Sequence, residues 1–530
     1  MIDLAKLAEK HFPFEKFNPG QKQAIIDVVA SIQAGNKHVI LEAPTGVGKS
    51  VIATTVHNML QEIDENWRTT ITTTTKALQD QYCNDDKSIF DLRGRKNYGC
   101  NEGAEYYNSG ECRVLTHKHM CQKETNCDYY ITRQHWCEEA ALRLTNVAFQ
   151  IEACPMLVCA PENKANLIVL DECHNLPAEI VSHSCLEINL AQIPNTKDVA
   201  PQLIPALYKF VDSFKKDSVG GAAKITKKQL QAARDIAMDA TAIFENLQGA
   251  KTNTQQMKKN MSAVEELQNF TDKLFAFSRG TGKWILTAYI IGNKLQLKPV
   301  YANQVAEGSM FSKADVFLHM SAAICGIEQY TKQLGITDCV YVSVENPIPA
   351  RNRKIIMKAV APMSQKHDNT KKMAAAIDKI ANHQKGNGVV HSVSFKLAEQ
   401  LKEQMQNKHR VLISNNRREI LHFLKTKTDG ILVSPSVETG YDFKEDLCRW
   451  QIIPKVPYLY IGDPYVKYNM ENDSDWYARE AILRMIQASG RGVRGITDWA
   501  NTFILDSNAC PLIANNACMF PEWWIDALVM

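Results

Sequence analysis

Short apolar runs that alternate with stretches of helical periodicity make up most of the chain. In the first part the runs are rich in β-branched residues and cover positions 38–41, 69–75, 167–170 and 317–323. A second series begins at about residue 341, with runs at 388–392, 430–434, 451–456 and 503–506. Buried strands that alternate with helices predict parallel sheets, so we expect an α/β protein with two such domains.

Two stretches of different character interrupt the first series. Residues 86–140 are polar and rich in cysteine, with little core of their own. Residues 185–285 have the pattern of amphipathic helices, for example from Lys227 to Asn246, and Trp284 to Val300 alternates like a hairpin that returns to the first domain. We therefore expect the first domain in three parts, at 1–85, 141–184 and 286–340, inserts at 86–140 and 185–285, and a second domain at 341–530.

The first strand run leads into a glycine-rich loop, A-P-T-G-V-G-K-S, at residues 43–50. Gly46 and Gly48 allow the backbone N–H groups to turn toward an anion, and the start of the following helix adds partial positive charge. Lys49 is expected to reach the β- and γ-phosphates of a nucleotide, and the Ser50 hydroxyl to hold Mg²⁺. The strand–loop–helix context favours this interpretation over a turn with an incidental lysine.

Acidic residues follow the apolar run at 167–170. Asp171 and Glu172 stand at its end, in the string D-E-C-H. A carboxylate at the carboxyl end of a parallel strand faces the crevice where ligands bind. We expect Asp171 to hold Mg²⁺ through water, Glu172 to polarise the attacking water, and His174 to couple the site to the neighbouring domain.

The second domain carries a pair of arginines in the string Q-A-S-G-R-G-V-R at residues 487–494. Arg491 and Arg494 are three residues apart, on one face of a turn. Two guanidinium groups on one face suit a triphosphate that the other domain holds. Near the N-terminus, Gln21 in the string F-N-P-G-Q has a two-sided amide that can read an adenine edge.

Five cysteines lie in the 86–140 insert. Four thiolates can hold a [4Fe–4S] cluster or zinc. Structural zinc usually has paired C-x₂₋₄-C knuckles, whereas 11, 8 and 5 residues separate the first four cysteines here, which suits a cluster better. We take Cys100, Cys112, Cys121 and Cys127 as the ligands and Cys137 as the spare, with structural zinc as the alternative.

The overall composition narrows the possible partners. A net charge of +3 gives no global basic signature, so any nucleic-acid surface must be a local groove. No apolar run approaches the ~20 residues of a membrane span, and the N-terminus has no signal-peptide pattern, so we expect a cytoplasmic protein with no membrane partner. Fifteen cysteines in such a chain indicate thiols or metal ligands rather than disulfides.

Taken in order, these strings resemble the XPD/DinG type of superfamily 2 helicases, and the match extends over nearly the whole chain. The strings T-T-T-T-K-A-L-Q-D-Q, S-A-A, V-E-T-G-Y-D-F and I-I-P-K-V-P-Y add to it. The resemblance implies two RecA-like domains with ATP between them, and an iron–sulfur domain and a helical arch inserted in the first. It also implies an ATP-dependent monomer that moves 5′→3′ on single-stranded DNA and unwinds forked duplex DNA. The short DinG-like layout suggests a bacterial or phage-infected cell.

The resemblance also implies roles for single residues. The expected catalytic residues are Lys49, Asp171, Glu172, Gln487, Arg491 and Arg494. The expected ATP and Mg²⁺ site consists of Gln21, Thr45, Gly46, Gly48, Lys49, Ser50, Asp171 and Asp442. Cys100, Cys112, Cys121 and Cys127 are expected to hold the [4Fe–4S] cluster.

Two strings depart from the family pattern. The string S-A-A stands where Ser-Ala-Thr is usual, so Ala323 lacks a hydroxyl. In the family this position bears on the coupling of hydrolysis to strand movement. The string D-E-C-H replaces D-E-A-H. The first departure favours an alternative, a DNA-stimulated ATPase that displaces proteins or R-loops without processive unwinding. A third possibility, a module that only grips DNA, conflicts with the intact lysine, acidic pair and arginines.

Overall fold

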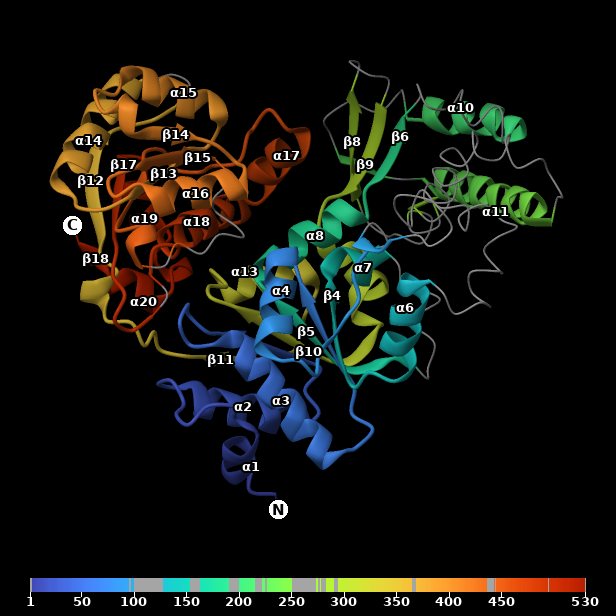
Figure 1. The fold of residues 1–530 in the computed structure, drawn as a ribbon. Coiled ribbons are helices and arrows are strands. Elements are labelled where there is room, and N and C mark those ends of the chain that lie inside the picture. Colours follow the sequence, from blue (N-terminus) through green and yellow to red (C-terminus); the bar gives the residue numbers. More distant parts are fainter. Residues whose placement is uncertain are drawn as a thin grey trace.

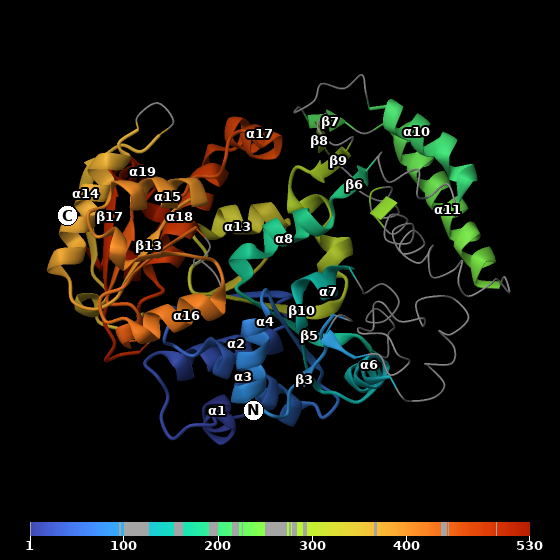
Figure 2. The ribbon, with the colours of Figure 1, turned by 45° about the horizontal axis from the view of Figure 1, so that its top comes forward.

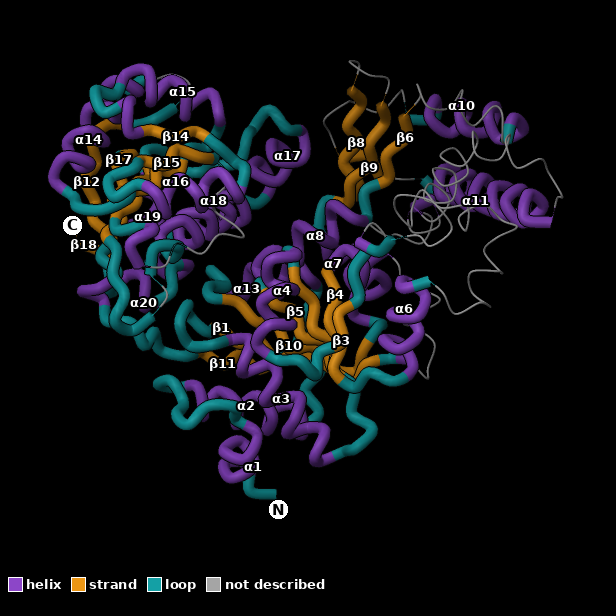
Figure 3. Tube along the Cα trace, in the orientation of Figure 1, coloured by secondary structure: helices purple, strands orange, loops and turns teal. Residues whose placement is uncertain are grey.

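The computed structural model shows two parallel-sheet α/β domains and a separate antiparallel sheet (Figures 1 and 3). It describes residues 2–94, 97–99, 127–152, 163–189, 200–214, 222–224, 226–249, 273–274, 277, 283–289, 294–364, 368–435, 443, 445–493 and 495–529. In this part of the chain no helix is long and apolar enough to cross a membrane. The expectation of two α/β domains with parallel sheets is confirmed.

The first sheet has seven parallel strands in the order β11-β1-β10-β5-β2-β4-β3. Their bounds are β1 (His38–Glu42), β2 (Thr69–Thr73), β3 (Phe90–Asp91), β4 (Leu142–Asn146), β5 (Ala165–Asp171), β10 (Ala314–Ser321) and β11 (Val340–Ser343). Strand β10 lies between β1 and β5 and pairs with both. The loops after β1, β5 and β10 therefore emerge at one edge of the sheet, where ligands bind in open α/β sheets.

Successive residues of these strands face opposite sides of the first sheet, because side chains alternate along a strand. On one side, Val39 and Leu41 join a core with α1 (Leu4–His11), α2 (Gln21–Gln33) and α3 (Lys49–Ile63). On the other side, Ile40 joins a core with α7 (Val147–Glu152), α8 (Leu176–His183) and α13 (Ile327–Leu334). Burial on both faces explains why the central strands β5 and β10 are mostly apolar.

The second sheet also has seven parallel strands, in the order β14-β15-β13-β16-β17-β12-β18. Their bounds are β12 (Ile355–Ala361), β13 (Gly388–His391), β14 (Val411–Ile413), β15 (Ile431–Ser434), β16 (Trp450–Ile453), β17 (Asn501–Asp506) and β18 (Leu528–Val529). The accompanying helices are α14 (Thr370–His383), α15 (Phe395–Gln404), α16 (Arg417–Thr426), α17 (Pro464–Asn472), α18 (Ser474–Ser489), α19 (Ala509–Asn515) and α20 (Glu522–Ile525). In both ribbon views α13 lies on the side of the first domain that faces the second (Figures 1 and 2).

A four-stranded antiparallel sheet, ordered β6-β9-β8-β7, forms a third unit with α10 (Ile204–Asp212) and α11 (Lys227–Gly249). Its strands are β6 (Leu186–Asn189), β7 (Ala222–Lys224), β8 (Lys283–Tyr289) and β9 (Lys294–Pro299). The hairpin β8–β9 pairs with β6 and β7 and not with the first sheet, so it belongs to the insert. The boundary that we expected at 285/286 cuts through β8, and the one at 340/341 cuts through β11, which pairs with β1.

Buried histidines are concentrated in the first domain. Burial lowers the pKa of His38, His57, His174 and His391 to about 4, and it holds the pKa of His319 well below the ordinary value of a histidine. Of these five, His391 alone lies in the second domain. Each is therefore neutral at pH 7, which matters for the stability of the chain in acid.

Candidate active site

The phosphate loop, residues 43–50, connects β1 to α3. Gly46 and Gly48 have φ of 92° and 88°, a region that favours glycine, and Gly48 is the N-cap of α3. A Cβ at Gly48 would lie 2.8 Å from Gln21 Nε2, so a side chain does not fit there. Lys49 and Ser50 begin α3, which places both side chains beside the backbone N–H groups of the helix start.

Gln21 braces the phosphate loop from behind. Its side chain is buried, Oε1 accepts from the Asn18 N–H at 2.9 Å, and Nε2 donates to the Gly48 carbonyl at 3.4 Å. Asn18 Nδ2 donates to the carbonyls of Gly46 and Val47, at 3.2 Å each. Each end of the Gln21 amide thus makes one contact that holds the phosphate loop, and each end keeps one further hydrogen-bonding site.

The acidic pair lies at the end of β5. Asp171 accepts from the Tyr82 hydroxyl at 3.1 Å and from the Glu172 N–H at 2.9 Å. Burial, and then the charge of Glu172, raise the pKa of Asp171 to about 6, while Lys49 opposes this shift. Glu172 has φ of 52°, an uncommon conformation for a non-glycine residue, and its Oε1 lies 3.9 Å from Lys49 Nζ. The lysine and the acidic pair therefore share one site.

His174 connects this acidic pair to the loop after β10, residues 321–325, which we call the 321–325 loop. Its Nδ1 lies 2.8 Å from Ser321 Oγ and 3.4 Å from Glu172 Oε2. The Ser321 hydroxyl donates to the Ala323 carbonyl at 2.9 Å and accepts from the Ala323 N–H at 3.2 Å. Since that hydroxyl proton is already used, His174 Nδ1–H is the donor to Ser321.

The arginine segment of the second domain faces the phosphate loop. A cavity of about 20 Å³ between the domains, room for one water molecule, is lined by Thr45 on one side and by Ser489 and Gly490 on the other. A Cβ at Gly490 would lie 3.8 Å from Thr45 Oγ1. Arg491 follows directly and donates to Gln487 Oε1 at 3.4 Å. The loop and the arginine segment are thus neighbours across the domain boundary.

Charges from both domains converge on His174. Burial lowers its pKa to about 4; Glu172 opposes this, and the positive charges of Arg479, Lys49 and Arg491 add to it. Arg479 and Arg491 belong to the second domain, whereas Lys49 and Glu172 belong to the first. Charged groups of both domains therefore lie near His174.

Sequence reasoning missed Arg479, which lies inside α18. Its side chain is fully buried and donates to the carbonyls of Ile324 and Cys325 in the first domain. A signal was present, because Arg479 stands three residues after Trp476 and three before Ile482, within the apolar stripe of the helix. A charge in such a stripe requires a partner.

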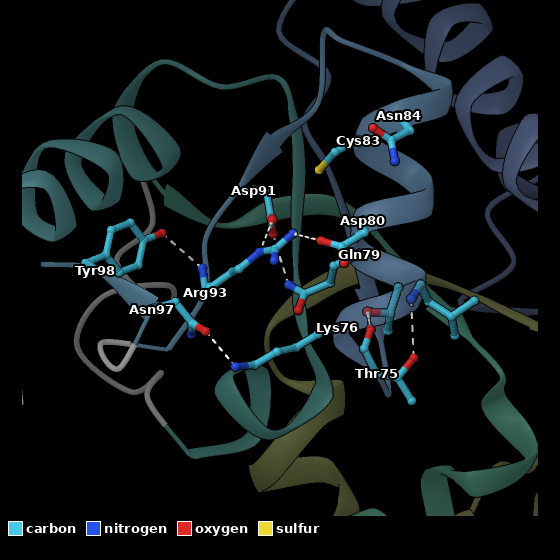
Figure 4. Close-up of polar contacts among 12 residues, drawn as sticks. Thr75, Lys76, Gln79, Asp80, Cys83, Asn84, Asp91, Arg93, Asn97 and Tyr98 are labelled. Atoms are coloured by element: carbon cyan, nitrogen blue, oxygen red, sulfur yellow. Dashed lines mark hydrogen bonds and ion pairs between the residues drawn. The ribbon is translucent and has the colours of Figure 1, made fainter. Parts of the chain in front are cut away.

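The stem of the cysteine-rich insert is anchored on α4 (Lys76–Asp85), as Figure 4 shows. Arg93 binds Asp91 at 2.5 Å and Asp80 at 2.7 Å, and its N–H donates to the Tyr98 hydroxyl. Lys76 donates to Asn97 at 2.6 Å. These contacts fix the chain just before residue 100 to the helix that follows β2.

The chain returns at α6 (Asp128–Glu138), with Cys127 as its N-cap. The Tyr98 and Tyr129 rings meet edge to face at 5.4 Å, and the half-buried Cys127 packs against the same small core. Cys137 is buried in that core, and burial raises the pKa of its thiol. Within the described ranges no group of three or more His, Cys, Asp or Glu side chains is arranged to hold a metal ion. Cys100, Cys112 and Cys121 lie outside those ranges, as do Arg494 and Asp442.

The geometry assembles the parts needed to bind and cleave a nucleoside triphosphate. Backbone N–H groups and Lys49 can hold phosphates, Ser50 and Asp171 can hold Mg²⁺, and Glu172 can orient water. Arg491 can neutralise charge that develops on the γ-phosphate, provided that it reaches the site from the second domain.

Comparisons with known proteins agree with this geometry. Residues 15–204 match the family model described as type III restriction enzyme, res subunit, and residues 377–526 match the helicase C-terminal domain. No curated protein sequence matches the chain. The fold is similar to a structure titled XPD helicase (TM-score 0.62, 15% identity, covering 96% of this chain and 99% of that one). It is also similar to Xpd4 from S. tokodaii (TM-score 0.59, 14% identity, 96% and 99%) and to an apo XPD (TM-score 0.58, 16% identity, 93% and 98%).

Proposed function

We propose that the chain is an XPD/DinG-like helicase of superfamily 2 and that it works as an ATP-driven 5′→3′ translocase on single-stranded DNA that separates duplex DNA; the two family models and the XPD-like fold support this. The observation that carries the proposal is the position of Gly490, the residue directly before Arg491, which lies beside Thr45 of the phosphate loop across the domain boundary. A nucleotide bound at Lys49 lies between the two domains in this arrangement. Its hydrolysis can therefore move one domain against the other.

In the first domain, the loop backbone with Thr45, Gly46 and Gly48 receives the phosphates of ATP. Lys49 contacts the β- and γ-phosphates, and Ser50 holds Mg²⁺. Asp171 binds the same ion, and its Tyr82 contact keeps the carboxylate aimed at the site.

Glu172 takes the role of orienting the water that attacks the γ-phosphate. In the second domain Gln487 and Arg491 sense the γ-phosphate. Arg494 and Asp442 are assigned to the same ATP site because they occupy the matching positions of the family motifs. Gln21 holds the phosphate loop in shape from behind.

The single strand lies across the carboxyl edges of both sheets, where two helix starts offer N–H donors to phosphates. Thr75 caps α4 in the first domain, and Ser394 caps α15 in the second. After β16, the ring of Tyr460 lies over Gly462, where a Cβ would clash at 2.2 Å, and yet is 70% exposed. An exposed aromatic ring at this edge suits base stacking.

The cysteine-rich insert holds a [4Fe–4S] cluster through Cys100, Cys112, Cys121 and Cys127, and the cluster supplies a rigid staple for a segment with little core. Cys127 and Cys137 are ten residues apart along α6, about 15 Å at helical rise, so one cluster cannot use both. Cys127 suits the role better because it stands at the half-buried start of α6, beside the residues that precede Cys100, whereas Cys137 is buried.

For the domain division we propose that the arch runs from 185 to 299 and that the second domain starts after β11, at about residue 350. The division follows the pairing of β9 with β6 and of β11 with β1. We propose a monomer, which acts on single-stranded and forked duplex DNA.

Strand displacement with 5′-tailed, 3′-tailed and blunt substrates, each in DNA and RNA, tests this function. We expect ATP-dependent release of the labelled strand from the 5′-tailed DNA alone, and no release by the Lys49→Ala variant. Release from 3′-tailed DNA alone would contradict the polarity, and ATPase activity with no response to any nucleic acid would contradict the function.

A second candidate function rests on Ala323, which lacks the hydroxyl usual at this position. In it the protein hydrolyses ATP on DNA and strips bound proteins or R-loops without processive unwinding. Displacement of a protein roadblock from single-stranded DNA, with no strand release from a fork, would favour this candidate.

A further inference from the structure

We propose that Arg479 is a positioning residue that couples the two domains: it clamps α18 to the 321–325 loop and thereby sets where Arg491 stands relative to the phosphate loop. This proposal rests on the proposed function. It identifies the contact through which a bound DNA strand changes the rate of ATP hydrolysis. It also assigns a role to a charge that the hydrolysis mechanism leaves unused.

The clamp is a two-pronged contact between a buried guanidinium and two successive carbonyls. Arg479 Nε donates to the Cys325 carbonyl at 3.0 Å, and an Nη donates to the Ile324 carbonyl at 2.9 Å. The guanidinium carbon lies 5.8 Å from the centre of the Tyr330 ring. A fully buried charge is costly unless it is bonded, so these contacts hold Arg479 firmly to the first domain. Lysine has the charge but not the planar fork that reaches both carbonyls.

The loop that receives the clamp has a fixed shape. Cys325 and Gly326 have φ of 56° and 86°, and the positive φ at Cys325 is a strained conformation that the surroundings must hold. The Ile324 N–H donates to the buried Glu42 carboxylate at 2.8 Å. At its other end the loop is bonded through Ser321 to His174, beside Glu172. A continuous chain of contacts thus runs from the acidic pair to Arg479.

The helix that carries the clamp also carries the γ-phosphate sensors. Arg479 and Gln487 are eight residues apart on α18, about 12 Å along its axis, and Arg491 follows the helix end. A second tether lies at the N-cap of α18, where the Asp473 carboxylate accepts from Gln329 and Lys332 of α13, each at 3.0 Å. The first domain therefore holds the near half of this helix, and the far half presents Arg491 to the nucleotide.

This arrangement explains how the loop functions with Ala323 in place of a hydroxyl residue. Ser321 already bonds both the N–H and the carbonyl of Ala323, which closes the loop. The Ala323 side chain is fully buried in a core of the second domain with Ile482 and Met485 of α18. Apolar packing and the Arg479 clamp take the place of a threonine contact.

For each variant the test measures the ATPase kcat with single-stranded DNA and without it, and divides the first by the second. This ratio does not depend on the fraction of active protein. If the bound strand acts on the site through this clamp, stimulation by DNA is lost with it, so we expect the ratio to fall at least about tenfold in Arg479→Ala; small misplacements of catalytic groups cost up to about a hundredfold in rate. Arg479→Lys, the variant with less risk to folding, is expected to lose part of the ratio and to keep the Kd for a non-hydrolysable ATP analogue. Arg410→Ala is the matched control, because Arg410 pairs with Asp429 inside the second domain, and its ratio is expected to stay within about twofold of wild type.

A double-mutant cycle separates positioning from simple structural support. If Arg479 acts through Arg491, then Arg479→Lys adds little to the loss in an Arg491→Lys background, whereas independent effects multiply. A wild-type ratio in Arg479→Lys and Arg479→Ala, or full multiplication in the cycle, would overturn the clamp. Wild-type protein without any response to DNA would instead overturn the proposed function, so the two failures are distinct.

Discussion

Replacement of Glu172 by glutamine separates nucleotide binding from hydrolysis in this site. The side chain keeps its shape but loses the carboxylate that we assign to the attacking water. Loss of general-base function costs about 10²- to 10⁴-fold in rate, so kcat for ATP hydrolysis is expected to fall by that range with single-stranded DNA present. The phosphate loop and Lys49 are unchanged, so binding should persist.

The structure also predicts the direction of the change in nucleotide affinity. Glu172 Oε1 lies 3.9 Å from Lys49 Nζ, and the two side chains are 24% and 14% exposed, so the carboxylate competes with phosphate for this lysine. A unit-charge pair at this distance is worth about 1 kcal/mol in water and about 4 kcal/mol at an effective dielectric constant of ~20. Only part of this energy is expected to appear as tighter binding, because the ion pair is partly exposed. We therefore expect Glu172→Gln to bind ATP as tightly as wild type or up to about tenfold more tightly.

Single-turnover hydrolysis and equilibrium titration with a fluorescent non-hydrolysable ATP analogue measure the two effects separately. Lys49→Ala is the matched control, for which binding and hydrolysis are both expected to fall. Normal turnover by Glu172→Gln would refute the role of Glu172. Loss of analogue binding with an intact fold would refute the separation of the two functions.

Three further predictions concern the second domain, the cysteines and the buried histidines. Arg491→Ala is expected to lower kcat at least about 10³-fold with little change in ATP affinity, measured as above; a change in affinity alone would contradict its role at the γ-phosphate. Protein prepared without oxygen should be brown, and Cys127→Ser should lose iron and visible absorbance while Cys137→Ser keeps both; stoichiometric zinc in colourless wild type would replace the cluster by structural zinc. Since burial lowers the pKa of His57 to about 4, the unfolded chain binds more protons between pH 6.5 and 4, and the free energy of unfolding should fall as the pH decreases through this range. His57→Gln should remove up to about 3 kcal/mol of that fall in urea titrations, and an unchanged pH profile would contradict the assignment.

The sequence predicted those parts of the site that lie in one continuous stretch of the chain with a recognisable pattern. The phosphate loop is one continuous string, and its meaning depends on a strand before it and a helix after it, both of which leave clear periodic patterns. Asp171 follows a wholly apolar run for the same reason. Helix α11 was predicted from Lys227, and its structure begins there and continues to Gly249.

The parts that the sequence did not predict depend on contacts between distant residues. Arg479 binds carbonyls about 150 positions earlier in the chain, and no local pattern specifies that partner. The pairing of β9 with β6 spans more than 100 residues, so the alternation at 284–300 indicated a hairpin but not the sheet to which it belongs. Gln21 was interpreted from its amide alone, and its bond to Gly48 required the fold.

The most direct test of the account is a structure of the protein with ADP, aluminium fluoride, Mg²⁺ and single-stranded DNA. The account predicts that the Arg491 guanidinium contacts the fluoride that mimics the transferring phosphate, with Lys49 on the opposite side and Glu172 bonded to the attacking water. An Arg491 side chain turned away from the fluoride, with the two domains parted around the nucleotide, would contradict the claim that both domains form one ATPase site.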